Sequence, residues 1–61
     1  MNKFILLDDV LVSPDNIAYI EPFSSDYTKS VVVLKTKDSV GLVHFIVNMS
    51  LKDIFDILNK K

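Results

Sequence analysis

The chain contains no cysteine, arginine or tryptophan, and it has a single histidine and a single glycine. Without cysteine there can be no disulfide framework, thiolate nucleophile or cysteine-ligated zinc site. Without arginine, and with seven lysines set against eight acidic residues for a net charge of -1, the chain lacks the basic footprint of a nucleic-acid-binding protein. We therefore expect no cofactor and no metal site, and the charge balance disfavours a nucleic-acid partner.

Long apolar runs are also missing. The apolar stretch at residues 4–7 stops at Asp8-Asp9, so it is too short for the core of a signal peptide. No other run approaches the roughly 20 apolar residues of a membrane span. We therefore expect a cytoplasmic protein that does not enter a membrane.

The length of the chain limits how much apolar surface it can bury by itself. Residues 1–61 are enough for a single small domain, and 49% of them are hydrophobic. A chain of this size buries only about 60% of the surface that its unfolded form exposes. We therefore expect some of the apolar surface to be shared with another chain.

Most of the chain consists of short β-prone segments separated by turn residues. The segment 13–16, Ser-Pro-Asp-Asn, is typical of a turn, as is 37–39, Lys-Asp-Ser. Asp8-Asp9 is either a hairpin turn or a bend within one strand. The pattern predicts strands within residues 3–12, 17–21, 31–36 and 40–48.

The periodicity changes at the C-terminal end, where residues 50–60 are predicted to form a helix. Ser50 is a favourable N-cap, and Asp53 completes an arrangement close to a capping box. Lys60 and Lys61 lie where the helix dipole favours positive charge. The apolar stripe consists of Leu51, Ile54, Phe55, Ile57 and Leu58. The predicted fold class is α+β: a small antiparallel meander of about four strands with one C-terminal helix packed on one face.

The order of these segments resembles two known patterns. The residues that carry the resemblance are the 15–21 segment Asp-Asn-Ile-Ala-Tyr-Ile-Glu, the strand at 31–34 and the helix start Ser-Leu-Lys-Asp at 50–53. Over nearly its whole length the chain is similar to small FlbD-like proteins associated with flagellar genes. It also resembles the first half of the LytTR DNA-binding domain. The shared positions are strand, turn and cap residues, so the resemblance implies a fold and carries over no functional residue.

The sequence offers no catalytic set, so we expect that the protein is not an enzyme. His44 is the only histidine, and any scheme of acid-base or nucleophilic catalysis would have to use it. No motif surrounds it, and its simplest interpretation is a surface or interface residue of a strand. Asp8-Asp9 could offer oxygen ligands to a cation, but calcium needs six to eight such ligands, and a turn explains the pair better.

A small basic patch is the feature of the residues themselves that would suit nucleic acid, beside the LytTR resemblance. In a hairpin, three lysines would lie near Tyr27, as in proteins that bind single strands with lysines and stacking aromatics: Lys29, Lys35 and Lys37. Acidic residues interrupt this set. Phe23 and Tyr27, on either side of a polar loop, are better explained as anchors of a protein contact or as local packing.

The 40–48 segment is apolar on both faces. Val43, Phe45 and Val47 alternate with a second set that points the other way, namely Leu42, His44 and Ile46. If the first set faces the helix, the second faces water or another chain. The sequence therefore predicts a homodimer, formed either by packing of these outer sheet faces or by pairing of edge strands. Leu42, His44 and Ile46 are expected near the centre of its interface, with Phe23 and Tyr27 as further contacts.

These observations lead to one functional hypothesis and one alternative. The first is a protein-protein interaction module without enzymatic activity, a small homo-oligomeric regulatory adaptor or an inhibitor of a larger protein, of the kind that phages and mobile elements encode. Its expected partners are a second copy of the chain and a protein that the sequence does not identify. The alternative, implied by the LytTR resemblance, is a nucleic-acid-binding regulator.

Overall fold

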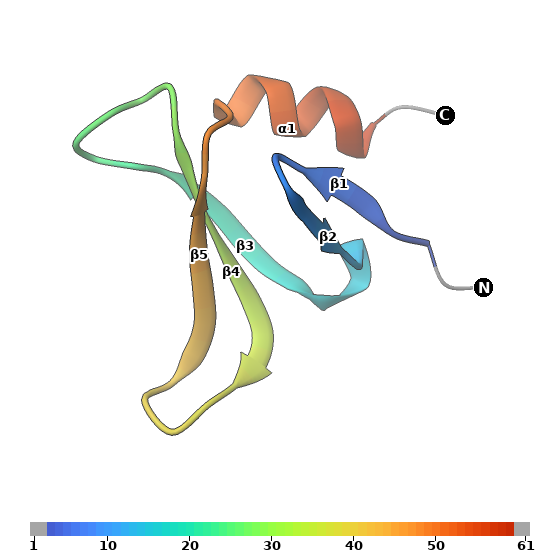
Figure 1. Ribbon diagram of the computed structural model, residues 1–61, viewed down its shortest axis with the longest axis vertical. Helices are drawn as coiled ribbons and strands as arrows, with labels where there is room; N and C mark the ends of the chain where they lie inside the picture. The colour runs from blue at the N-terminus through green and yellow to red at the C-terminus, as the bar shows by residue number, and fades with distance from the viewer. Residues whose placement is uncertain (1–2, 60–61) are drawn as a thin grey trace.

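The computed structural model describes residues 3–59. Two antiparallel sheets, β1-β2 and β3-β4-β5, are followed by one α-helix (Figure 1). The elements are β1 (Ile5–Leu7), β2 (Val10–Val12), the 3-10 helix η1 (Pro14–Asn16), β3 (Ile17–Pro22), β4 (Ser30–Lys37), β5 (Leu42–Val47) and α1 (Leu51–Leu58). The predicted α+β class with a C-terminal helix on the sheet is confirmed.

The N-terminal strand segment is a hairpin, not one bent strand. Ile5 pairs with Val12 and Leu7 with Val10, so β1 and β2 form a sheet of their own. Asp8 turns the chain with a φ of 58°, a left-handed conformation that aspartate adopts more readily than most residues. Its Oδ2 accepts a hydrogen bond from the backbone N–H of Asn48 at 3.2 Å. This bond ties the hairpin turn to the segment that joins β5 and α1.

The predicted turn at 13–16 is confirmed, and it takes the form of the 3-10 helix η1. The turn is closed by a backbone bond from the N–H of Asn16 to the carbonyl of Ser13 at 2.9 Å, and the Ser13 side chain does not cap η1. The side-chain amide of Asn16 donates to the hydroxyl of Thr36 at 2.9 Å. This second bond fastens η1 to β4.

A β-bulge in β3 brings two isoleucines to the same face of the sheet. Ile17 pairs with Leu34 of β4, and Tyr19 pairs with the adjacent Val33, so β3 has an extra residue at Ala18. In a regular strand, residues three apart point to opposite faces. The extra residue cancels this difference, and Ile17 and Ile20 both pack against the core.

The predicted last strand, 40–48, is shorter at its start. β5 begins at Leu42, because Gly41 has a φ of 147°, which L-residues rarely adopt in a strand. The loop before it is held by Asp38, whose Oδ1 accepts bonds from the backbone N–H groups of Val40 and Gly41 at 2.8 and 3.1 Å. Val40 and Gly41 therefore belong to the β4–β5 loop.

The C-terminal helix, predicted at residues 50–60, starts one residue later, at Leu51, and ends at Leu58, before the last described residue. Ser50 is the N-cap, and its Oγ accepts a bond from the backbone N–H of Asp53 at 3.3 Å, as expected. Leu58 is the last helical residue, and the side chain of Asn59 donates to the carbonyl of Phe55 at 2.9 Å. Lys60 and Lys61, predicted to complement the helix dipole, lie outside the described residues.

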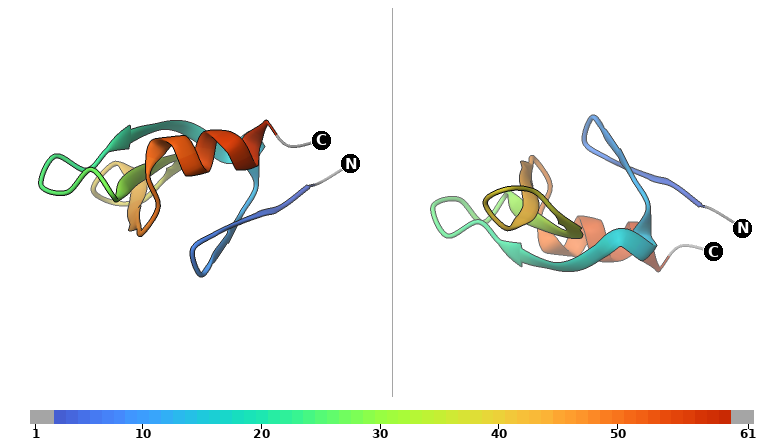
Figure 2. Two further views of the ribbon diagram at one scale, coloured as in Figure 1. Left: turned by 90° about the horizontal axis from the view of Figure 1, so that it is seen from above. Right: turned by 90° about the horizontal axis from the view of Figure 1, so that it is seen from below.

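The core lies between the β1-β2 hairpin, α1 and one face of the β3-β4-β5 sheet, which we call the inner face (Figure 2). Its buried members are Leu7, Val12, Val32, Val47 and Ile54. Ser30 is also fully buried, and its hydroxyl donates to the carbonyl of Met49 at 2.7 Å, so it leaves no unsatisfied oxygen in the interior. The helix contributes only one edge of its apolar stripe to this core.

The part of the β4–β5 hairpin that includes the loop extends away from the core. Figure 1 shows the loop between the two strands far from both α1 and the β1-β2 hairpin. Residues 35–42 are all exposed, and the molecule measures 36 × 32 × 18 Å. This flat shape leaves one side of the sheet without a second layer in the described residues.

Candidate functional site

The face of the β3-β4-β5 sheet that points away from the core is the candidate site, which we call the outer face. Strand pairing aligns Tyr19, Val33 and His44 in one row across the sheet, and Glu21, Val31 and Ile46 in the next. Leu42 shares this side of β5 by strand alternation. The outer face thus consists of Tyr19, Glu21, Val31, Val33, Leu42, His44 and Ile46.

Most of the apolar residues on the outer face are open to solvent. Tyr19 is 53% exposed and Ile46 is 51% exposed. Val33 differs: it is only 6% exposed although it is not part of the core cluster, because its row neighbours Tyr19 and His44 flank it within the sheet. An apolar surface formed by contiguous side chains of three strands is typical of an association site.

The charged and polar groups of this region lie at its margins. The Nδ1 atom of the His44 ring lies 3.3 Å from the carbonyl oxygen of Leu42, two residues earlier in β5. The pKa of Asp38, in the adjoining loop, lies below its ordinary range because the carboxylate accepts bonds from the N–H groups of Val40 and Gly41, with a smaller contribution from His44. The middle of the outer face therefore offers apolar contact rather than proton transfer.

The structure brings together three of the five predicted interface residues. Leu42, His44 and Ile46 share the outer face of β5. Phe23 is half-buried, and Tyr27 is exposed, in the loop that connects β3 to β4. That loop is closed by a bond from the N–H of Phe23 to the carbonyl of Lys29 at 3.1 Å. Phe23 and Tyr27 therefore belong to a separate loop, adjacent to the end of the sheet.

The predicted basic patch does not form. Lys29 comes directly before β4, and Lys37 is the last residue of that strand. An extended strand rises about 3.4 Å per residue, so these two positions are separated by roughly 25 Å. Tyr27 lies with Lys29 at one end, and Lys35 lies toward the other. The prediction was wrong because Lys29 and Lys37 lie at opposite ends of β4, and an extended strand keeps its two ends apart whatever its pairing.

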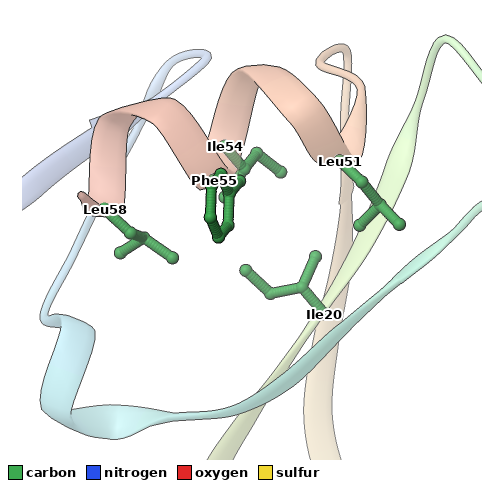
Figure 3. Close-up of a pocket in the computed structure, with 5 residues that line it drawn as sticks. All are labelled: Ile20, Leu51, Ile54, Phe55 and Leu58. Atoms are coloured by element: carbon green, nitrogen blue, oxygen red, sulfur yellow. The ribbon is translucent and has the colours of Figure 1, made fainter. Parts of the chain in front are cut away.

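A second apolar feature, which the sequence did not single out, is a groove between α1 and β3 (Figure 3). It encloses about 250 Å³ and is lined by Ile20, Leu51, Ile54, Phe55 and Leu58. Figure 3 shows the side chains of the helix and of Ile20 directed toward one another across it. In the sequence, the groove is indicated by the width of the apolar stripe on the helix. The stripe contains more apolar residues than the edge that packs against the core.

The acidic side chains do not form a metal centre. Asp8 and Asp9 occupy the β1–β2 turn, as predicted. Asp56 forms a surface ion pair with Lys52, with 3.4 Å between Oδ2 and Nζ. Across residues 3–59, no three side chains of histidine, cysteine, aspartate or glutamate gather closely enough to hold a metal ion.

Comparison with known proteins gives no match: no family model, curated protein or solved structure matches the chain. The similarity to FlbD-like proteins and to the LytTR domain therefore stays a prediction. In the described part of the chain, no helix combines the length and the apolar character that a bilayer crossing requires.

Proposed function

We propose that this protein is a small protein-protein interaction module without enzymatic activity, which self-associates and acts as a regulatory adaptor or as an inhibitor of a larger protein. The observation that carries the proposal is the outer face, where Tyr19, Leu42 and Ile46 form an exposed apolar surface. Large exposed apolar side chains on contiguous strands favour association over an isolated monomer.

The surface area of the chain supports self-association. It exposes 4699 Å², whereas a monomeric protein of 6.9 kDa exposes about 4,000 Å². The chain therefore leaves more surface uncovered than a compact molecule of its mass, in keeping with its flat shape. A second copy of the chain can cover this surface, because every molecule in solution carries the same apolar outer face.

The experiment is light scattering during size-exclusion chromatography at micromolar concentration. We expect a mass about twice that of the chain, and a larger fraction of monomer for Ile46→Asp, because that change replaces an apolar side chain of the associating surface with a charge. Ser24→Asp is the matched control: it adds the same charge in the exposed β3–β4 loop and should leave the dimer intact. A wild-type monomer at these concentrations would contradict the proposal.

The adaptor or inhibitor role needs a second measurement. An affinity purification from the native host, identified by mass spectrometry, should recover the same protein with the wild-type chain and with Ser24→Asp. Specific partner binding should then be reproduced with the purified partner. If no purified candidate binds the wild-type chain, self-association would stand without the regulatory role.

Nucleic-acid binding of the LytTR type stays the alternative. With seven lysines offset by eight acidic residues, the chain can neutralise few phosphates, so its affinity should collapse as salt rises. Fluorescence anisotropy with labelled DNA at about 150 mM salt distinguishes the two functions. Tight binding to one sequence under these conditions would put the alternative first.

A further inference from the structure

Strand β5 is an open edge of the β3-β4-β5 sheet. It pairs with β4 on one side, and no described strand lies on the other. Natural proteins usually protect an edge strand with a charge, a proline, a bulge or a very short length. β5 has six residues, Leu42–Val47, and carries neither charge nor proline. The irregularity in its pairing lies in β4, between Val33 and Lys37, and leaves β5 itself regular.

The opposite edge, β3, carries several of these protections. Pro22 has no N–H to donate, Glu21 brings a negative charge, and the bulge at Ala18 breaks the regular spacing of backbone groups. Of the two edges of this sheet, β5 is the one whose backbone is free to pair with another strand.

We propose that β5 pairs antiparallel with β5 of a second copy, so that two three-stranded sheets join into one continuous sheet around a two-fold axis. This inference rests on the self-association proposed above and specifies its geometry. The two-fold axis is perpendicular to the sheet and passes beside His44, so that His44 lies opposite His44 of the second copy. Leu42 then lies opposite Ile46 of the second copy on either side of the axis.

The side chains of β5 are self-complementary in this register. On the outer face, the two Leu42–Ile46 pairs flank the histidines, and on the inner face Val43 lies opposite Phe45 of the second copy. Apolar cross-strand pairs stabilise antiparallel sheets, and β5 contains no lysine, aspartate or glutamate that would meet its own copy. The same arrangement of β3 would place its charged and proline-bearing end in the pair.

The occupant of this edge is a second copy, because in this register the apolar side chains of β5 are complementary to those of another β5. The start of β5 belongs to the part of the hairpin that no described element covers (Figure 1). In the dimer, Leu42 of each copy lies beside Ile46 of the other copy.

The geometry leaves the α1–β3 grooves free. Rotation about an axis perpendicular to the sheet keeps both copies of α1 on the same side, at opposite ends of the joined sheet. The dimer would therefore present two identical apolar grooves, each lined by Ile20, Leu51, Phe55 and Leu58 among others, on one face.

Disulfide cross-linking tests the register directly, because the chain has no cysteine of its own. Residues directly opposite in an antiparallel pair have Cα atoms about 4.5–5.5 Å apart, within the range that a disulfide accepts. Under mild oxidation at micromolar concentration, His44→Cys should give mostly covalent dimer on a non-reducing gel. The control Tyr19→Cys, on the same face but at the opposite edge, should give little.

A mixing experiment sharpens the test. Leu42→Cys and Ile46→Cys should each cross-link poorly alone, since residue 42 is opposite residue 46 and not itself. Mixed and re-equilibrated, the two variants should form a covalent heterodimer, which mass spectrometry of intact protein identifies. Circular dichroism of each reduced variant checks that it is folded.

The outcomes separate this inference from the proposed function. A wild-type monomer in light scattering overturns both. A wild-type dimer whose folded His44→Cys variant stays uncross-linked overturns the β5 pairing alone, and strong cross-linking of Tyr19→Cys would do the same in favour of packing between outer faces.

Discussion

The two faces of the β3-β4-β5 sheet are made of similar residues but have different surroundings. On the inner face, Val32 and Val47 are covered by α1 and the β1-β2 hairpin. On the outer face, Val33 is sheltered only by neighbours in the same sheet, and Ile46 is half exposed. A strand pattern with one solvated face would alternate apolar and polar residues. Here both faces are apolar, and the described residues provide a second layer over the inner face alone.

The comparison shows that two side chains with similarly low exposure can be buried by different surroundings. Val32 and Val33 are adjacent in β4, and both are buried. Val32 contacts a second layer, whereas Val33 is enclosed by Tyr19 and His44 of the flanking strands. The first kind of burial joins separate elements, and the second joins strands that already pair through their backbones. Substitutions at the two faces should therefore differ in effect.

The largest effect is expected at the helix that covers the inner face. Ile54 is 1% exposed, so Ile54→Ala should lower the free energy of unfolding by about 2–5 kcal/mol. A domain this small rarely has more than about 3–5 kcal/mol of stability, so the variant should be largely unfolded. Phe55, 63% exposed on the same helix, is the control, and Phe55→Ala should change stability by less than about 1 kcal/mol. Urea denaturation of both variants measures the difference.

The opposite ranking would show that the helix packs through Phe55. The sequence did not separate these two positions, since both belong to the apolar stripe. The prediction therefore also tests the direction in which α1 faces the sheet.

A smaller difference is expected between the two adjacent valines of β4. Val32→Ala removes atoms from the centre of the core and should lower the free energy of unfolding by about 2 kcal/mol. Val33→Ala leaves a gap that the side chains of Tyr19 and His44 can close, so about 1 kcal/mol is expected. Equal losses in denaturation would show that the two faces are packed alike, which would contradict the comparison.

The cap of the covering helix is expected to contribute about 1 kcal/mol. Ser50→Ala removes the oxygen that accepts the bond from the N–H of Asp53. Ser39→Ala, in the exposed β4–β5 loop, is the control and should be neutral. Thermal or urea unfolding of the two variants gives the comparison. A neutral Ser50→Ala would mean that another group satisfies this end of the helix.

The smallest effect is a loss of stability in acid, from the two loops at the ends of β4. The pKa of Asp26 lies below its ordinary value of 3.8, chiefly because the carboxylate accepts a bond from the Thr28 hydroxyl and then one from the Thr28 N–H. The pKa of Asp38 is also below its ordinary value. A lowered folded-state pKa means that these groups stabilise the fold above the ordinary value, and that this stabilisation is lost as pH falls through the lowered pKa.

The double variant Asp26→Asn with Asp38→Asn keeps an acceptor oxygen at each position but removes the titration. Unfolding free energies measured by urea between pH 7 and pH 2 should show a shallower acid decline for this variant than for the wild type. Parallel curves would show that other carboxyl groups cause the acid loss.

Some features of the candidate site could be predicted from the sequence. The alternation of β5 placed Leu42, His44 and Ile46 on one face, because side chains in a strand alternate whatever the strand packs against. The two isoleucines of β3 could not be placed in the same way. Their common face depends on the bulge at Ala18, which exists only because β3 and β4 pair in a particular register. The groove beside α1 likewise depends on how the helix is seated.

The local elements follow from residue types alone: the β-prone runs and turn residues specify the strands, and Ser50 specifies the start of the helix. These choices depend on contacts between near neighbours in the chain. The packing of distant segments decides that Ile54 and not Phe55 enters the core, and that β1 and β2 form a sheet of their own. Those outcomes depend on the relative positions of distant segments, and a wide apolar stripe or a short strand is compatible with more than one of them.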